Sequence, residues 1–234
     1  MPGHPVEIAA RPAPFSFAPA TTAVIVVDMQ HDFASPEGMF GRAGIPLDGI
    51  RAVVEPTRRV LAAARAAGIL VVYLTMGFAD DLADLGLPDA PNRERHRALG
   101  VGRAAFAPDG AASRVLVRGT WNTAIIDELA PSADDVVVSK HRYSGFFETK
   151  LDAVLRQHDI RTLVFTGCTT SVCVESTLRD GFYRDYRCLL LRDCCAEAIG
   201  GDEARTNHDA TLTVIEALFG WTASSPAFLA AVAI

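Results

Sequence analysis

The sequence has little positive charge relative to its negative charge. Its 234 residues include 22 lysines and arginines against 28 aspartates and glutamates, so the formal net charge is −6. Nucleic-acid-binding domains carry a basic surface, and this balance argues against a nucleic-acid partner.

No apolar run reaches about 20 residues, the length that spans a bilayer. The first twenty residues lack the basic start and apolar centre of a signal peptide, which predicts a cytoplasmic protein without a membrane partner.

The sequence also lacks paired-cysteine patterns, although it holds five cysteines. An odd number of cysteines without an export signal does not predict a disulfide framework, and a reducing compartment is expected. There is no CxxC motif and no Cys/His spacing typical of zinc. We therefore expect a protein that uses neither a metal ion nor another cofactor.

Half of the residues are hydrophobic, and many fall into short runs bounded by turn residues. Such runs predict buried strands, here at 22–30, 69–75, 135–140, 162–167 and 187–193. Amphipathic segments between them predict helices, here at 47–68, 120–129, 148–159, 171–185 and 202–220. The segment 76–118 is polar and rich in Gly, Pro and Arg, and we interpret it as a long functional excursion.

Strands that alternate with helices predict an α/β fold of three layers, α/β/α, with a mostly parallel open sheet and helices on both faces. We expect residues 1–20 to be an N-terminal arm and residues 21–234 to form this single domain. In such a sheet, ligands bind beyond the carboxyl ends of the strands, where the strand order switches.

Three reactive side chains follow predicted strands. Asp28 ends the first strand, Lys140 ends the third, and Cys173 lies just past the fourth. If the first and fourth strands are neighbours, Asp28 and Cys173 face each other, and Lys140 reaches in from the far side. A thiol at a helix N-terminus beside a lysine is expected to have a lowered pKa. An aspartate can take the thiol proton and pass it to a leaving amine, while backbone N–H groups of the turn stabilise an oxyanion.

Each of these residues also has an ordinary structural explanation. A cysteine after a strand is commonly a small core residue, and we interpret Cys168 in this way. An aspartate there commonly caps a helix or a turn, and a lysine there is commonly solvated. A flavodoxin-like binding module thus remains an alternative to a hydrolase. It would need a glycine-rich phosphate turn after the first strand, where this sequence has the acidic DMQHDFASPEG.

Three ordered motifs favour the hydrolase. The stretches VIVVDMQHDF, SKHRYSGFFET and FTGCTTSVCVESTLRDGFYRDY resemble those of the isochorismatase-like cysteine hydrolases, over roughly residues 11 to 222. The stretches GTWNTAIIDEL and FGW are similar to the ureidoacrylate amidohydrolases of pyrimidine degradation. The resemblance implies a Rossmann-type, isochorismatase-like fold. It also implies a metal-free homo-oligomer, dimer or tetramer, that releases ammonia from a small amide or ureido (carbamoyl) compound.

The resemblance further implies roles for single residues. Cys173 would be the nucleophile that forms a thioester or S-carbamoyl intermediate, Asp28 the base and then the acid, and Lys140 their electrostatic partner. The oxyanion hole would consist of the backbone N–H groups of Thr169 and Cys173. A non-proline cis peptide bond would join Cys168 to Thr169.

Four side chains are candidate substrate contacts. Met76 stands near the position where ureidoacrylate enzymes offer a polar amide, and Trp121, Tyr143 and Phe146 are aromatic residues near the motifs. A lost polar contact changes which substrate is held. Biuret, triuret and N-carbamoyl amino acids are therefore alternatives to ureidoacrylate. Isochorismatase activity fits less well, because isochorismatases generally lack the nucleophilic cysteine.

Overall fold

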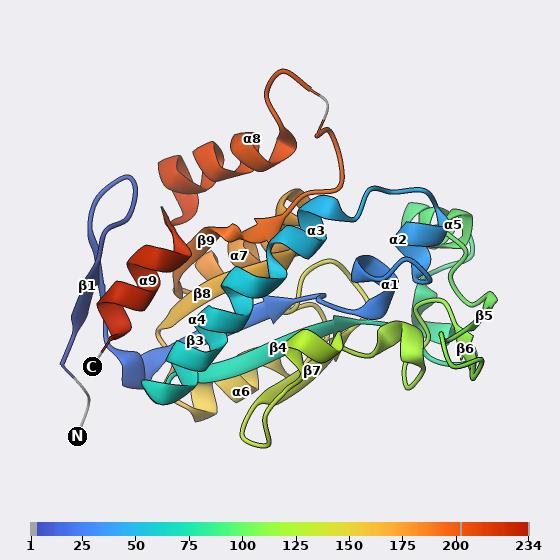
Figure 1. The fold of residues 1–234 in the computed structure, drawn as a ribbon, viewed down its shortest axis with the longest axis horizontal. Helices are drawn as coiled ribbons and strands as arrows, with labels where there is room; N and C mark the ends of the chain where they lie inside the picture. Colours follow the sequence, from blue (N-terminus) through green and yellow to red (C-terminus); the bar gives the residue numbers. More distant parts are fainter. Residues whose placement is uncertain (1–3, 202, 234) are drawn as a thin grey trace.

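The computed structural model describes residues 4–201 and 203–233. Its central sheet has six strands, all parallel, in the order β10-β9-β8-β3-β4-β7 (Figure 1). The strands are β3 (Thr22–Val27), β4 (Leu70–Met76), β7 (Val136–Lys140), β8 (Thr162–Cys168), β9 (Arg187–Ala196) and β10 (Trp221–Ala223). The predicted α/β fold with a parallel sheet is confirmed, and the five predicted strands all occur.

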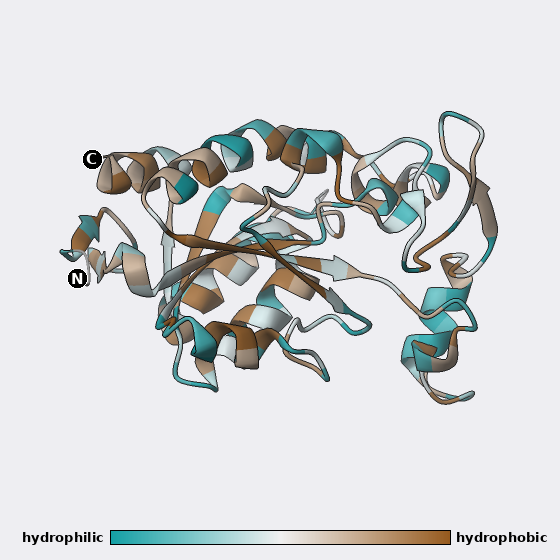
Figure 2. Cartoon of the chain, turned by 90° about the horizontal axis from the view of Figure 1, so that it is seen from below, coloured by the Kyte–Doolittle hydropathy of each residue, from teal (hydrophilic) through white to brown (hydrophobic). Residues whose placement is uncertain are grey.

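Helices cover both faces of the sheet, and the alternation of side chains along each strand divides the core in two. Val24 and Val26 of β3 pack on one face and Ile25 and Val27 on the other. Every residue of β3 and β8 is buried, which explains why both strands are almost uniformly apolar. Figure 2 shows the brown strands edge-on between two layers of helices that carry teal residues on their outer sides.

The two layers are built from different parts of the chain. One contains α3 (Asp48–Ala52), α4 (Val54–Ala66) and α9 (Ser225–Val232). The other contains α6 (Leu151–Gln157) and α7 (Glu175–Phe182).

Several predicted helices are broken or shorter than the sequence pattern suggested. The helix expected at 47–68 is divided at Val53 into α3 and α4. The prediction of a helix at 120–129 is wrong, because this segment forms two 3-10 turns, η3 (Trp121–Thr123) and η4 (Asp127–Leu129). The single proton of the Thr120 hydroxyl is shared between the carbonyls of Arg114 and Val117, at 3.0 and 2.8 Å, in the segment before the first turn.

Two later helices have irregular ends. The helix expected at 171–185 begins as a π-helical turn, η5 (Thr170–Val174), and continues as α7. The helix expected at 202–220 is α8 (Asn207–Val214) followed by a second π-helical turn, η6 (Ile215–Phe219), and its first predicted residue lies outside the described residues.

Short elements near both ends of the chain were not predicted. Within the expected N-terminal arm, β1 (Val6–Ile8) pairs antiparallel with β2 (Phe15–Phe17). This hairpin packs against α9, and β1 and α9 lie side by side in Figure 1. In β2 the two phenylalanines are buried and the serine between them is exposed, so three residues suffice to anchor the hairpin.

The excursion 76–118 has secondary structure of its own. It contains η2 (Ala83–Leu85), α5 (Pro91–Ala98) and the antiparallel pair β5 (Ala104–Phe106) and β6 (Ala112–Arg114). Figure 1 shows α5, β5 and β6 at the end of the molecule toward which the sheet strands point. The short helices α1 (His31–Ala34) and α2 (Met39–Arg42) lie at the same end. These segments therefore surround the carboxyl edge of the sheet.

Candidate active site

The first reactive residue, Asp28, lies where the strand order switches. The chain runs from β3 outward through β4 to β7 and then returns to β8 on the other side of β3. Asp28 directly follows β3 and has a φ of 52°, a left-handed conformation that Asp adopts more readily than most residues. Its N–H donates to the carbonyl of Leu74 at 2.9 Å, which fixes this turn against β4. The neighbouring strands β3 and β8 place Asp28 in the predicted crevice.

Lys140 reaches the same point from the edge of the sheet, across the end of β4. Its Nζ donates to Oδ2 of Asp28 at 2.8 Å and to the carbonyl of Arg142 at 3.3 Å, and it contacts Sδ of Met76 at 3.6 Å. Both charged side chains are buried, with exposures of 0% and 1%. A buried charge is tolerated only when it is paired, so the two side chains form one unit.

Cys173 lies beside this unit, in the η5 turn that follows β8. Its side chain is close enough to Asp28 and Lys140 to influence the pKa of both. Oδ1 of Asp28 is buried, and among residues 4–201 and 203–233 it has no hydrogen-bond partner. One carboxylate oxygen therefore holds the lysine, and the other is available to accept a proton.

The charges of the three groups are set mainly by burial. Burial raises the pKa of the Cys173 thiol, the Asp28 carboxylate raises it further, and Lys140 opposes both. The expected lowering of the thiol pKa is therefore wrong, because loss of water outweighs the lysine. Burial also raises the pKa of Asp28, although Lys140 lowers it. Burial lowers the pKa of Lys140, but Asp28 and Cys173 raise it by more, so the pKa lies above its usual value. The thiol thus keeps its proton in the resting protein.

The end of β8 is shaped by a close approach to β3. Gly167 pairs in register with Val27 and has a φ of 111°, and a Cβ atom there would lie 2.0 Å from the Val27 carbonyl oxygen. The next peptide bond, Cys168–Thr169, is cis. The Cys168 thiol is buried in the core and donates to the carbonyl of Asp28 at 3.3 Å. Cys168 therefore packs beneath the site, while Thr169 and Cys173 line a cavity above it.

This cavity has a volume of about 220 Å³. Its remaining walls are almost all apolar and are formed by Phe33, Met39, Phe40, Ile45, Met76, His96, Leu99, Leu116, Tyr143, Val172, Ala198 and Ile199. Of the four predicted contacts, Met76 and Tyr143 line the cavity, whereas Trp121 and Phe146 do not. Trp121 stacks on His31 with ring centroids 4.3 Å apart, and Phe146 packs on Tyr186 in the core.

The sequence did not predict most of the residues that line the cavity, nor the role of Asp32, whose carboxylate binds the backbone of two of them. Asp32 is fully buried, and its oxygens accept from the N–H of Met39 at 2.8 Å, the N–H of Leu116 at 2.6 Å and the side-chain amide of Asn122. Burial raises its pKa against the lowering effect of these hydrogen bonds, of which that from Asn122 is the largest. The only signal in the sequence was a second aspartate four residues after Asp28.

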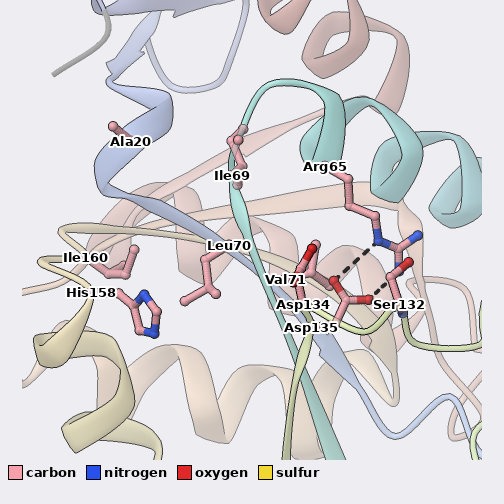
Figure 3. Close-up of a pocket in the computed structure, with 11 residues that line it drawn as sticks. Ala20, Arg65, Ile69, Leu70, Val71, Ser132, Asp134, Asp135, His158 and Ile160 are labelled. Atoms are coloured by element: carbon pink, nitrogen blue, oxygen red, sulfur yellow. Dashed lines mark hydrogen bonds and ion pairs between the residues drawn. The ribbon is translucent and has the colours of Figure 1, made fainter. Parts of the chain in front are cut away.

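A larger hollow lies at the opposite edge of the sheet, at the start of β4 (Figure 3). There Arg65 donates to Asp135 at 2.6 Å, and Asp135 also accepts from the N–H of Ser132. This hollow contains none of Asp28, Lys140 or Cys173. The candidate active site is therefore the smaller cavity above Cys173.

The described part of the chain offers neither a clustered metal site nor a membrane-spanning helix. No group of three or more His, Cys, Asp or Glu side chains in these ranges is arranged to hold a metal ion. No helix there is both long and apolar enough to cross a membrane.

Comparisons with known proteins agree with the fold. Residues 22–227 match the family model of the isochorismatase domain. The chain is 43% identical to the ureidoacrylate amidohydrolase RutB of Methylobacterium radiotolerans, over 98% of this chain and 86% of that protein. It is 42% identical to RutB of Klebsiella pneumoniae, over 95% of this chain and 92% of that protein.

Solved structures show the same likeness. A cysteine hydrolase from Pseudomonas syringae pv. phaseolicola superimposes with a TM-score of 0.76 and 33% identity, over 92% of this chain and 94% of that one. N-carbamoylsarcosine amidase from Thermoplasma acidophilum superimposes with a TM-score of 0.64 and 29% identity, over 88% and 96% of the two chains.

The parallel sheet and these matches together define a hydrolase of isochorismatase-like α/β fold, and the chain belongs to the isochorismatase family. It is a hydrolase that acts on the carbon–nitrogen bonds of linear amides. The resemblance seen in the three sequence motifs is thereby confirmed.

Proposed function

We propose that this protein is a metal-independent cysteine amidohydrolase that cleaves a small ureido or amide compound through a covalent intermediate on Cys173. The relatives named as ureidoacrylate amidohydrolases make ureidoacrylate the reference substrate. The observation that carries the proposal is the unpaired, buried Oδ1 of Asp28, whose other oxygen is held by Lys140, beside a thiol that opens to the cavity.

In the first half of the reaction, Cys173 attacks the carbonyl carbon and its proton passes to Asp28. The raised pKa of the thiol means that it arrives protonated and needs a base, and the raised pKa of Asp28 makes its carboxylate a stronger base than in water. The backbone N–H groups of Thr169 and Cys173, on the turn that lines the cavity, would hold the oxyanion. Asp28 then returns the proton to the departing nitrogen, and a thioester or S-carbamoyl group remains on the sulfur.

In the second half, Asp28 takes a proton from water, and the hydroxide attacks the same carbon. The sulfur leaves as the thiolate, which Lys140 stabilises before the proton returns from Asp28. With a ureido substrate the product is carbamate, which breaks down to ammonia and carbon dioxide. Biuret, triuret and N-carbamoyl amino acids are alternative substrates for the same steps.

The test is to measure ammonia release from each of these compounds by the unaltered protein and by its Cys173→Ala and Cys173→Ser variants. We expect both variants to lose turnover at least about 10³-fold. Mass spectrometry of the unaltered protein during turnover should show the acyl or carbamoyl group on the peptide that contains Cys173. Near-normal turnover by either variant on every accepted compound would rule out the proposal.

A further inference from the structure

The walls of the cavity above Cys173 are apolar almost throughout. Phe33, Met39, Met76 and Leu116 are buried there, with exposures of 1–7%, and Leu99 borders the solvent side. None of the lysines or arginines in the described ranges is among the residues that line the cavity. A substrate group that extends from the reacting carbonyl therefore meets hydrocarbon.

The one buried ammonium near the cavity is already neutralised. Nζ of Lys140 lies 2.8 Å from the Asp28 carboxylate, and its side chain has no exposed surface. The pair contributes no net charge, so it cannot balance a second carboxylate that comes with the substrate.

His96 does not supply a positive charge either. Its Nδ1 lies 2.7 Å from the carbonyl oxygen of Asn92, which can only accept, so Nδ1 carries the proton. Burial lowers the pKa of His96 against the raising effect of this hydrogen bond, which keeps the imidazole neutral and Nε2 an acceptor. His96 can thus receive an N–H of a ureido group and would repel a carboxylate.

The arginines around the cavity are committed elsewhere or exposed. Arg93 donates through Nη1 to the carbonyl of Gly86, although its buried Nε has no partner among the described residues. Arg118 is paired with Asp84, and Arg142 donates to the carbonyl of Asp84. Arg95 lies on the exposed side of α5 and lowers the pKa of Tyr143, against the larger raising effect of burial. Arg95 is thus an exposed cation close to Tyr143, a residue of the cavity wall.

We propose that the preferred substrates of this protein carry an uncharged, apolar group beside the ureido or amide group that reacts, rather than a carboxylate. This inference rests on the proposed function and narrows it. An unpaired carboxylate in an apolar cavity loses its hydration without compensation, whereas an apolar group gains by leaving water. The chain would then differ in specificity from relatives named for a carboxylate-bearing substrate.

The test compares ureidoacrylate with its methyl ester, in which the ureido group is retained and the charge is removed. Ammonia release by the unaltered protein gives kcat/KM for each compound. We expect the ester to be favoured at least about 100-fold. Equal or better use of the acid would overturn the inference but leave the cysteine chemistry intact, provided that Cys173→Ala abolishes the release. Hydrolysis of neither compound would overturn the inference, and the cysteine chemistry would stand only if Cys173→Ala abolishes ammonia release from biuret, triuret or an N-carbamoyl amino acid.

A new charge in the cavity wall provides the matched variant. Leu99→Arg places a cation at a wall residue that is 41% exposed, where an arginine is accommodated without loss of core packing. The acid-to-ester ratio of kcat/KM should rise at least about tenfold. Leu87→Arg, at a residue that is 73% exposed and away from the cavity, should leave the ratio unchanged. A ratio that is insensitive to Leu99→Arg, or an acid preference that disappears in Arg95→Gln, would contradict the inference.

Discussion

The ammonium nitrogen of Lys140 lies 2.8 Å from Oδ2 of Asp28, in a region where neither side chain exposes more than 1% of its surface. The two residues are 112 positions apart in the sequence and stand at the ends of β3 and β7, which β4 separates. Each therefore depends on the other for a counter-charge, and this dependence can be measured.

Lys140→Met should destabilise the fold by about 3–5 kcal/mol, because it leaves the Asp28 carboxylate buried and unpaired. Urea denaturation measures this loss. The double variant Lys140→Met/Asp28→Asn should recover part of it, since no unpaired charge remains. If the losses of unfolding free energy in Lys140→Met and in Asp28→Asn simply add up to the loss in the double variant, the pair does not act as a unit.

Alkylation of Cys173 should depend steeply on pH. Because its thiol pKa is raised, the thiolate is scarce at neutral pH and increases as the pH rises. The rate with iodoacetamide should therefore increase about tenfold per pH unit from pH 7 to pH 9 without levelling off. Peptide mapping separates this reaction from the other four cysteines, all of which are buried. A plateau below pH 8 would mean a low thiol pKa.

Asp28→Asn should separate thiol reactivity from catalysis. The Asp28 carboxylate raises the pKa of Cys173, so its removal leaves Lys140 facing the sulfur and should increase alkylation at pH 7 at least about fivefold. Turnover should fall about 10²–10⁴-fold, because the proton acceptor is gone. Asp127→Asn, at an exposed carboxylate, is the control and should change neither rate. Slower alkylation in Asp28→Asn would refute this electrostatic account.

Gly167→Ala should destabilise the protein by more than about 3 kcal/mol and abolish activity, because its Cβ would collide with the Val27 carbonyl oxygen. Gly110→Ala is a matched control with a φ of 85° but no atom within 4 Å of the new Cβ. Gly110→Ala should therefore lower the free energy of unfolding only by the strain of the left-handed backbone conformation, about 1 kcal/mol. Thermal unfolding compares the two, and equal losses would show that the close approach of β3 and β8 is unimportant.

The sheet and the positions of the reactive residues could be predicted from the sequence because they depend on short-range patterns. Buried parallel strands appear as apolar runs. Asp28 and Lys140 stand directly at or after the ends of two of them, and Cys173 lies in the turn that follows a third. The topology of α/β folds then brings strand ends to one edge. The direction of the thiol pKa could not be predicted, because it depends on how completely the folded chain removes water from Cys173.

The cavity walls could not be predicted, because they depend on contacts between distant segments. Phe146 has the same aromatic character as Tyr143, yet it turns into the core while Tyr143 faces the cavity. His96 lies in a polar, arginine-rich stretch and is nevertheless buried. Thr120, at the start of the 3-10 turns at 120–129, bonds to the preceding segment through its hydroxyl, and a helical pattern does not reveal such a contact.

Three of the cavity-lining residues, His96, Leu99 and Leu116, come from the excursion that follows β4, whereas the reacting groups stand at the ends of sheet strands or in the turns that follow them. During evolution, substitutions within this one excursion can thus change the substrate specificity of such an enzyme while its reacting groups stay the same. A chimera that exchanges only this excursion with that of a relative should transfer the relative's substrate preference without changes to the sheet.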